Sequence, residues 1–279
     1  MKTLKRILAA TTLLVTLGFA SEANAQVPLE NFFKNPEKAG YQISPDGKYF
    51  SYMAPYENRL NLFVQEVGSD KATRITSETV RDLAGSMWAN GHRILYIKDT
   101  AGDENFQLYG VNVDGTDSKA YTAFPKVRTT IIDPLENIDS LVIIGLNKRN
   151  PQVFDPYRLN LNNGELTQLA ENPGNIQGWM TDHNGKLRVA LAIVDGVNTQ
   201  ILYRETEEQP FRPVLTTNFK ETVSFATFTP DNKMVYALTN IGRDKTALVL
   251  MDPATCEEKE VLYTNDKYDI SGLGYSELD

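Results

Sequence analysis

The sequence predicts an all-β protein, a β-propeller of four-stranded sheets, and three observations carry this prediction. From Tyr41 onward, short runs rich in Val, Ile, Leu, Tyr, Phe and Thr are separated by clusters of Gly, Asn, Asp and Pro. Such punctuation is typical of strands and turns. A related turn recurs with a period in the forties, and no convincing long stretch after Tyr41 has helical periodicity.

Five related turns define the repeat. Their second positions are residues 45, 89, 134, 183 and 230, so successive turns are 44 to 49 residues apart. Pro presets φ, and Gly or Asn accepts a positive φ, as a tight turn requires. The turns are Ser44–Gly47, Trp88–Gly91, Asp133–Asn137, Asp182–Gly185 and Thr229–Asn232.

Each turn is followed by a pair of apolar runs that we expect to form adjacent strands. The pairs are 49–53 with 61–67, 93–97 with 107–113, 141–145 with 156–161, 187–191 with 199–204, and 234–238 with 246–251. A repeat of this length with about four short strands indicates a propeller blade. The sequence therefore predicts about five blades.

A sixth turn is due near residue 276, where Tyr275–Asp279 ends the sequence. The preceding run, Ile270–Gly274, is expected to be the first strand of a sixth blade. We therefore expect five blades plus the start of a sixth, an incomplete ring. Such a ring leaves a sheet face and an edge uncovered.

The first residues have the pattern of a secretory signal peptide over 1–25. Basic residues precede an apolar stretch over 7–19, and Ala23-Asn24-Ala25 is a small-residue cleavage site. These features predict export from a bacterium, a periplasmic or secreted product, and no stable membrane insertion after cleavage. We expect a lead-in segment over 26–40, with a short helix or turn at Pro28–Phe33, before a partial propeller over 41–279.

Composition and spacing exclude several classes of function. The 279 residues are 41% hydrophobic and 23% charged, which is ordinary for a folded globular chain. The formal net charge of −8 argues against nucleic-acid binding, which needs a basic face. His92, His183 and Cys256 form no zinc-ligand spacing, and no phosphate-loop pattern occurs, so neither a metal nor a cofactor is expected.

One polar loop is a candidate site. Asp103, Glu104 and Asn105 cluster with Asp99 between two predicted strands. They could contact a ligand channel or a second domain, or they could form a hairpin loop in which short side chains bind the local backbone. The structural interpretation is favoured because no partner base or metal-ligand set accompanies them.

Two tryptophans and three arginines also have both a ligand-binding and a structural interpretation. Trp88 and Trp179 lie at or near the start of a blade, where core packing explains them better than a ligand platform. Arg149, Arg158 and Arg188 could line a channel and bind a peptide carboxylate, or could be ordinary surface residues.

Three segments resemble the N-terminal propeller of serine peptidases of the prolyl oligopeptidase family, in particular members similar to dipeptidyl aminopeptidases and acylaminoacyl peptidases. They are Val27–Phe33, Ile43–Tyr49 and Lys98–Tyr109. The third, with Gly-Asp-Glu-Asn before an aromatic residue and Leu-Tyr, is the most selective.

The resemblance implies a seven- or eight-bladed propeller followed by an α/β-hydrolase domain with a Ser-Asp-His triad. In such enzymes the propeller covers the active site and restricts access to peptides. Here no serine has glycine both two positions before and two positions after it, so the G-x-S-x-G elbow is absent. No catalytic residue can be assigned, and we expect the α/β-hydrolase domain to be absent from residues 1–279.

We therefore expect the non-catalytic propeller part of an exported peptidase, which gates and orients peptide substrates for the missing hydrolase domain. The chain alone should have no peptidase activity. The alternative is a stand-alone periplasmic propeller that acts as a protein-binding scaffold, similar to TolB, and this alternative requires a closed ring. A complete five-bladed hydrolase with acidic residues in its funnel is disfavoured by the partial sixth unit.

Overall fold

The computed structural model describes residues 27–274 and divides the chain after Pro36 into two compact units. The predicted signal peptide over 1–25 and the last residues, 275–279, lie outside the described part. In the first unit, a 3-10 helix, η1 (Leu29–Phe32), follows Pro28, where the short helix was expected. Between residues 27 and 274, no helix has the length and apolar character needed to cross a membrane.

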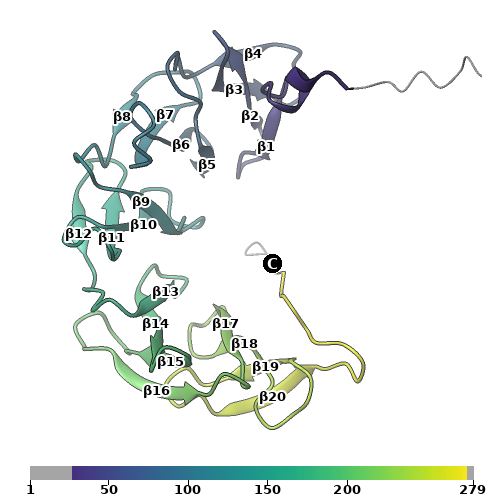
Figure 1. Ribbon diagram of the computed structural model, residues 1–279, viewed down its shortest axis with the longest axis vertical. Helices are drawn as coiled ribbons and strands as arrows, with labels where there is room; N and C mark the ends of the chain where they lie inside the picture. Colours follow the sequence, from purple (N-terminus) through teal and green to yellow (C-terminus); the bar gives the residue numbers. More distant parts are fainter. Residues whose placement is uncertain (1–26, 275–279) are drawn as a thin grey trace, which may run out of the picture. The chain divides into compact units, whose positions relative to one another are not determined.

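The second unit consists of five four-stranded antiparallel sheets, each made of four strands consecutive in the chain (Figure 1). This arrangement confirms the predicted propeller of about five blades. The first sheet contains β1 (Ala39–Ile43), β2 (Tyr49–Tyr56), β3 (Arg59–Glu66) and β4 (Ala72–Arg74). The second contains β5 (Gly85–Asn90), β6 (Arg93–Lys98), β7 (Gln107–Asn112) and β8 (Lys119–Ala120).

The other three sheets repeat this order. The third contains β9 (Thr129–Asp133), β10 (Leu141–Leu146), β11 (Asp155–Asn160) and β12 (Leu166–Gln168). The fourth contains β13 (Ile176–Thr181), β14 (Leu187–Val194), β15 (Asn198–Tyr203) and β16 (Arg212–Thr217). The fifth contains β17 (Val223–Phe228), β18 (Val235–Thr239), β19 (Ala247–Met251) and β20 (Glu258–Tyr263).

The recurring turns join the first strand of each sheet to the second, so each sheet begins one strand before its turn. The first sheet therefore starts at Ala39, inside the segment expected to be a lead-in. Gly47, Gly185 and Asn232 adopt positive φ, as the turn chemistry predicts. In the third turn Leu135 takes this conformation, with φ 54°.

The segment expected to begin a sixth blade forms no strand: Ile270–Gly274 is irregular. The Ile270 N–H donates to the carbonyl of Thr246, and the Thr246 N–H donates to the Asp269 carboxylate at 2.8 Å. These two contacts hold the segment against the loop before β19, where it makes isolated hydrogen bonds and no ladder.

Consecutive sheets pack through apolar faces at three of their four junctions. One cluster, which includes Leu62, Trp88 and Ile94, joins the first and second sheets. A second cluster, with Leu108 and Ile144, joins the second and third sheets. A third cluster joins the fourth and fifth sheets. None of the buried apolar clusters within residues 27–274 combines side chains of the third and fourth sheets.

Candidate functional site

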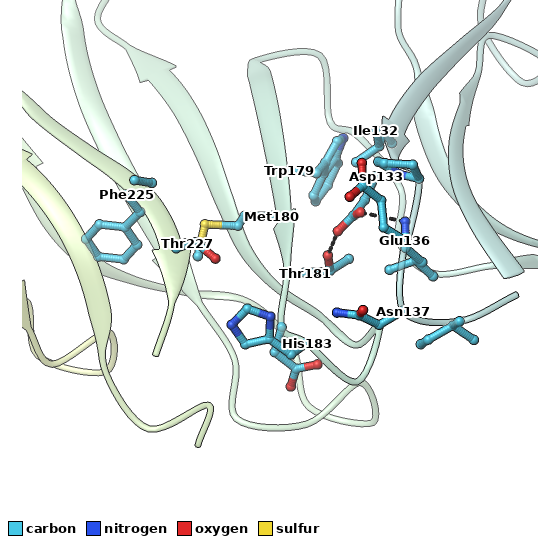
Figure 2. A pocket seen from close by; sticks show the side chains of 15 residues that line it. Ile132, Asp133, Glu136, Asn137, Trp179, Met180, Thr181, His183, Phe225 and Thr227 are labelled. Atoms are coloured by element: carbon cyan, nitrogen blue, oxygen red, sulfur yellow. Dashed lines mark hydrogen bonds between the residues drawn. The ribbon is translucent and has the colours of Figure 1, made fainter. Parts of the chain in front are cut away.

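The junction between the third and fourth sheets holds two cavities. The first, of about 350 Å³, is lined by the end of β9 with the turn through Ile138, by residues 179–183, and by residues 225–227 of β17 (Figure 2). The second, of about 460 Å³, is lined by residues 130–132, 152–154 and the segment leading into Trp179. Ile132 and Trp179 line both cavities. The cavities are therefore neighbours that share one wall.

Asp133 ties the two sheets together at this wall. One carboxylate oxygen accepts the backbone N–H of Leu135 at 2.8 Å, which supports the left-handed turn. The other accepts the hydroxyl of Thr181 on β13, as the dashed lines in Figure 2 show. Both oxygens of the Asp133 carboxylate therefore act as acceptors at this junction.

His183 makes the corresponding link to the fifth sheet. Its backbone N–H donates to the Asn232 side chain at 2.9 Å, and its Nε2 lies 2.9 Å from the carbonyl oxygen of Phe228. Because a carbonyl oxygen only accepts, Nε2 carries the proton in this contact. His183 therefore serves to join sheets through hydrogen bonds.

The first cavity is acidic. Its lining includes Asp133, Glu136 and Asp182, and no lysine or arginine. Asp182 is buried and paired with Arg188 at 3.1 Å, which neutralises it. Glu136 is exposed and makes no contact with a positive group in the described part of the chain. Asp133 and Glu136 therefore give this cavity a negative side.

The second cavity is lined by uncharged residues only. Gln152 and Gln177 are exposed at its edge, and neither side-chain amide bonds to another residue between 27 and 274. The Asn172 amide, by contrast, is fully engaged: it accepts from the backbone N–H groups of Gly174 and Ile176 and donates to two carbonyl oxygens. The two glutamines are thus the free polar side chains of this cavity.

The two tryptophans have different environments. Trp88 is buried in the cluster between the first and second sheets, as the predicted core role requires, and its Nε1 is buried without a hydrogen-bond partner. Trp179 is half-buried, packs on Phe211 with ring centroids 5.7 Å apart, and lines the cavities. Its Nε1 makes no hydrogen bond to any described residue. Trp179 therefore both packs and presents a free donor.

The candidate polar loop lies elsewhere, between β6 and β7, and does not line either cavity. The Asp103 carboxylate accepts the backbone N–H groups of Thr100 and Asn105 and the Asn105 side-chain amide. The last of these bonds is the largest of the causes that lower the pKa of Asp103 below its usual range. The Glu104 N–H donates to buried Asp99. These bonds are those of a self-contained loop; contact with a second domain stays a prediction.

The three arginines considered as channel residues are bound to acids of the chain itself. Arg149 makes two bonds of 2.9 Å to buried Asp155, and Arg158 pairs with Glu207 at 2.7 Å. Arg188 pairs with Asp182. Their charges are therefore already engaged.

Sequence reasoning considered Trp179 but gave no site role to Asp133 or Gln177, because it placed the blade start at each turn. The first strands β9 and β13, which precede the turns, were left unassigned, and they carry Asp133 and Trp179. The signal that could have found them is the short β-rich run directly before each turn.

Comparison with known proteins extends these observations. No known protein-family profile matches the chain. Over 239 residues, 82% of this chain, it is 31% identical to dipeptidyl aminopeptidase BIII of Pseudoxanthomonas mexicana. Over 281 aligned positions, 94% of this chain, it is 27% identical to dipeptidyl peptidase family member 6 of Caenorhabditis elegans. The chain spans 34% and 37% of the lengths of these two relatives.

Among solved structures, a prolyl endopeptidase aligns with a TM-score of 0.56 at 11% identity, over 81% of this chain and 36% of that one. Identity this low shows the shared fold alone. The fold thus defines the class of protein, a β-propeller. The dipeptidyl peptidase homologues then confirm the resemblance to the prolyl oligopeptidase family predicted from the sequence.

Proposed function

We propose that this chain is the propeller part of an exported prolyl oligopeptidase-type serine peptidase, in which it admits and orients peptide substrates for an α/β-hydrolase domain. The observation that carries the proposal is the 31% identity to dipeptidyl aminopeptidase BIII over most of the chain. The chain itself holds no G-x-S-x-G elbow, so acyl transfer belongs to a region outside it.

The cavity chemistry supports a peptide as the molecule that is admitted. At neutral pH a free peptide has a cationic amino end and a backbone of alternating donors and acceptors. The first cavity offers the carboxylates of Asp133 and Glu136, and the second offers uncharged amides. Because opposite charges attract most strongly in a partly enclosed site, the amino end favours the first cavity.

Both cavities lie at the turn-bearing first strands of their sheets, so a bound peptide would contact elements that are held by inter-sheet hydrogen bonds. The bond between Asp133 and Thr181 fixes the wall common to both cavities. A rigid wall orients a ligand at a lower entropy cost than a mobile loop. Orientation of the substrate is therefore the role that the geometry supports best.

The test is to read the coding DNA beyond codon 279 and to assay the product of the complete reading frame with chromogenic dipeptide anilides. We expect further blade repeats, a G-x-S-x-G segment, and hydrolysis that stops when its serine is replaced by alanine. N-terminal sequencing of the periplasmic product should begin at Gln26 if the signal peptide is cleaved as predicted.

Absence of any hydrolase segment in the frame, together with stable binding of a folded protein and no binding of peptides, would support the scaffold alternative and remove the proposal.

A further inference from the structure

Within the described residues, the junction between the third and fourth sheets lacks a buried apolar cluster. Such a cluster fills each of the other three junctions, which we call the sealed junctions. A propeller is stabilised mainly by burying sheet faces against one another. Here the facing strands β9 and β13 instead line two cavities, with Ile132 and Trp179 left half-buried. Cavities of this size are within the range of about 300–1,000 Å³ that ligand sites occupy.

The uncharged cavity presents three hydrogen-bonding groups without partners in the described chain. The side-chain amides of Gln152 and Gln177 each carry two N–H donors and one acceptor, and the Trp179 indole carries one donor. These groups are complementary to the C=O and N–H of a peptide unit. The indole face adds apolar contact area for small side chains.

Charge decides which part of a peptide fits there. No charged side chain lines this cavity, so an ionised group entering it would lose hydration without gaining a counter-charge. Across the shared wall, Glu136 supplies an unpaired carboxylate. The uncharged cavity therefore suits the neutral interior of a peptide whose amino end lies in the acidic cavity.

We propose that Trp179, Gln152 and Gln177 form a subsite for an uncharged, extended peptide segment, with Trp179 as the residue that positions it. This inference rests on the proposed function, because it takes a peptide as the ligand. The Trp179 Nε1–H donates to a backbone carbonyl of the segment, and the glutamine amides pair with the neighbouring peptide unit. The subsite selects against charged side chains at the bound positions.

The experiment uses the full chain and two probes: acetyl-tetraalanine amide, which is uncharged, and tetraalanine amide with a free amino group. Affinities are measured by isothermal titration calorimetry. In the Trp88→Phe variant Trp179 is the remaining indole, so a change in tryptophan emission reports that the peptide binds beside Trp179. Trp88→Phe leaves no partner unpaired, because the Trp88 Nε1 has none. Circular dichroism checks that each variant is folded.

We expect the capped peptide to change the Trp179 emission in Trp88→Phe. Trp179→Phe and Gln177→Ala should each weaken binding of the capped peptide about 3- to 10-fold, the range of one lost hydrogen bond. Gln168→Ala, at an exposed glutamine of β12 outside the cavities, is the matched control and should leave affinity unchanged.

Equal binding of the capped peptide to the wild-type chain, Trp179→Phe and Gln177→Ala would overturn the subsite. If the free-amino peptide still bound and Glu136→Gln still weakened it, the proposed function would stand without the subsite. Failure of both peptides to bind the wild-type chain would count against the subsite and the proposed function together.

Discussion

Two neighbouring junctions of the propeller differ in their contacts: one is apolar and filled, and the other is polar and contains cavities. Between the second and third sheets, fully buried residues such as Leu108, Ile144 and Leu159 form a continuous apolar cluster. Between the third and fourth sheets, the contacts include the Asp133–Thr181 hydrogen bond and the Arg158 bond to the Gly185 carbonyl, around two cavities. The first junction supplies stability, and the second leaves polar groups available to a ligand.

The same distinction separates the polar loop from the cavities. Asp103 and Asn105 are rich in polar atoms, but these bond to one another and to the local backbone. Glu136, Gln152 and Gln177 are less conspicuous in the sequence, but the polar atoms of their side chains have no partner among the described residues. Unused hydrogen-bonding capacity at the lining of a cavity is therefore a better indicator of a site here than the density of charged residues.

The largest effect should come from matched isoleucine truncations at the two junctions. Ile144→Ala removes a fully buried side chain from the sealed junction and should lower the free energy of unfolding by about 2–5 kcal/mol. Ile132→Ala at the cavity wall should cost about 1 kcal/mol or less, because its side chain is only half-buried. Urea unfolding midpoints measure the loss of stability in both variants. Equal losses would contradict the difference between the two junctions.

Arg188→Met tests another sealed junction, the one between the fourth and fifth sheets. Arg188 pairs with buried Asp182, and its guanidinium lies over the Phe228 ring at 5.4 Å. Removing it leaves Asp182 without its counter-charge, at a cost of about 3 kcal/mol. Lys233→Met, which breaks an exposed pair with Asp231, is the control and should change stability by less than about 0.5 kcal/mol. A similar small loss for both variants would show that the Arg188 pair is not structural.

Gly145→Ala sharpens the description of the uncharged cavity. An added Cβ would lie 2.6 Å from Thr130 Oγ1 and 3.3 Å from Phe154, both of which line that cavity. Displacing these two side chains should lower the free energy of unfolding by about 1–2 kcal/mol. Gly85→Ala, where the nearest atom lies at 3.9 Å, should be tolerated. Thermal unfolding midpoints compare the two variants. Equal midpoints would mean that the residues of the cavity wall move to accommodate the added Cβ without loss of stability.

Glu136→Gln tests the acidic cavity with little expected change in stability. Binding of a peptide with a free amino end should weaken about 2- to 5-fold, the range of one exposed charge pair. Glu104→Gln in the polar loop is the matched control and should have no effect on binding. Calorimetric titration gives both affinities, and a larger effect from Glu104→Gln would move the site to the loop.

Cys256 should be inert at neutral pH. Burial raises its thiol pKa to about 11, and the nearby Asp252 carboxylate adds to the shift. The reactive thiolate is therefore scarce below that pH, and alkylation by iodoacetamide at pH 8 should be much slower than in urea. Since the unfolded chain loses this proton near pH 9, stability should also fall as pH rises from about 9 toward 11. Rapid alkylation of the native chain at pH 8 would show an exposed thiol.

The fold was largely predictable because strand and turn signals are local. The turns at Ser44 and Thr229 even share one hydrogen-bond pattern, in which the hydroxyl donates to an Asp two residues later at 2.7 Å. The cavity site was not predictable from composition. It depends on which side chains remain unbonded once β9 and β13 face each other, and that is a property of packing across 48 residues of sequence.

The most direct test of the central claim is photo-crosslinking of a peptide that carries a benzoylphenylalanine residue, with mass-spectrometric mapping of the attachment sites on the full chain. A ligand site at the third and fourth sheets predicts attachment within residues 130–137 and 177–183, reduced by excess unlabelled peptide. Specific attachment confined to the loop at 99–105, or to the sealed junctions, would contradict this account.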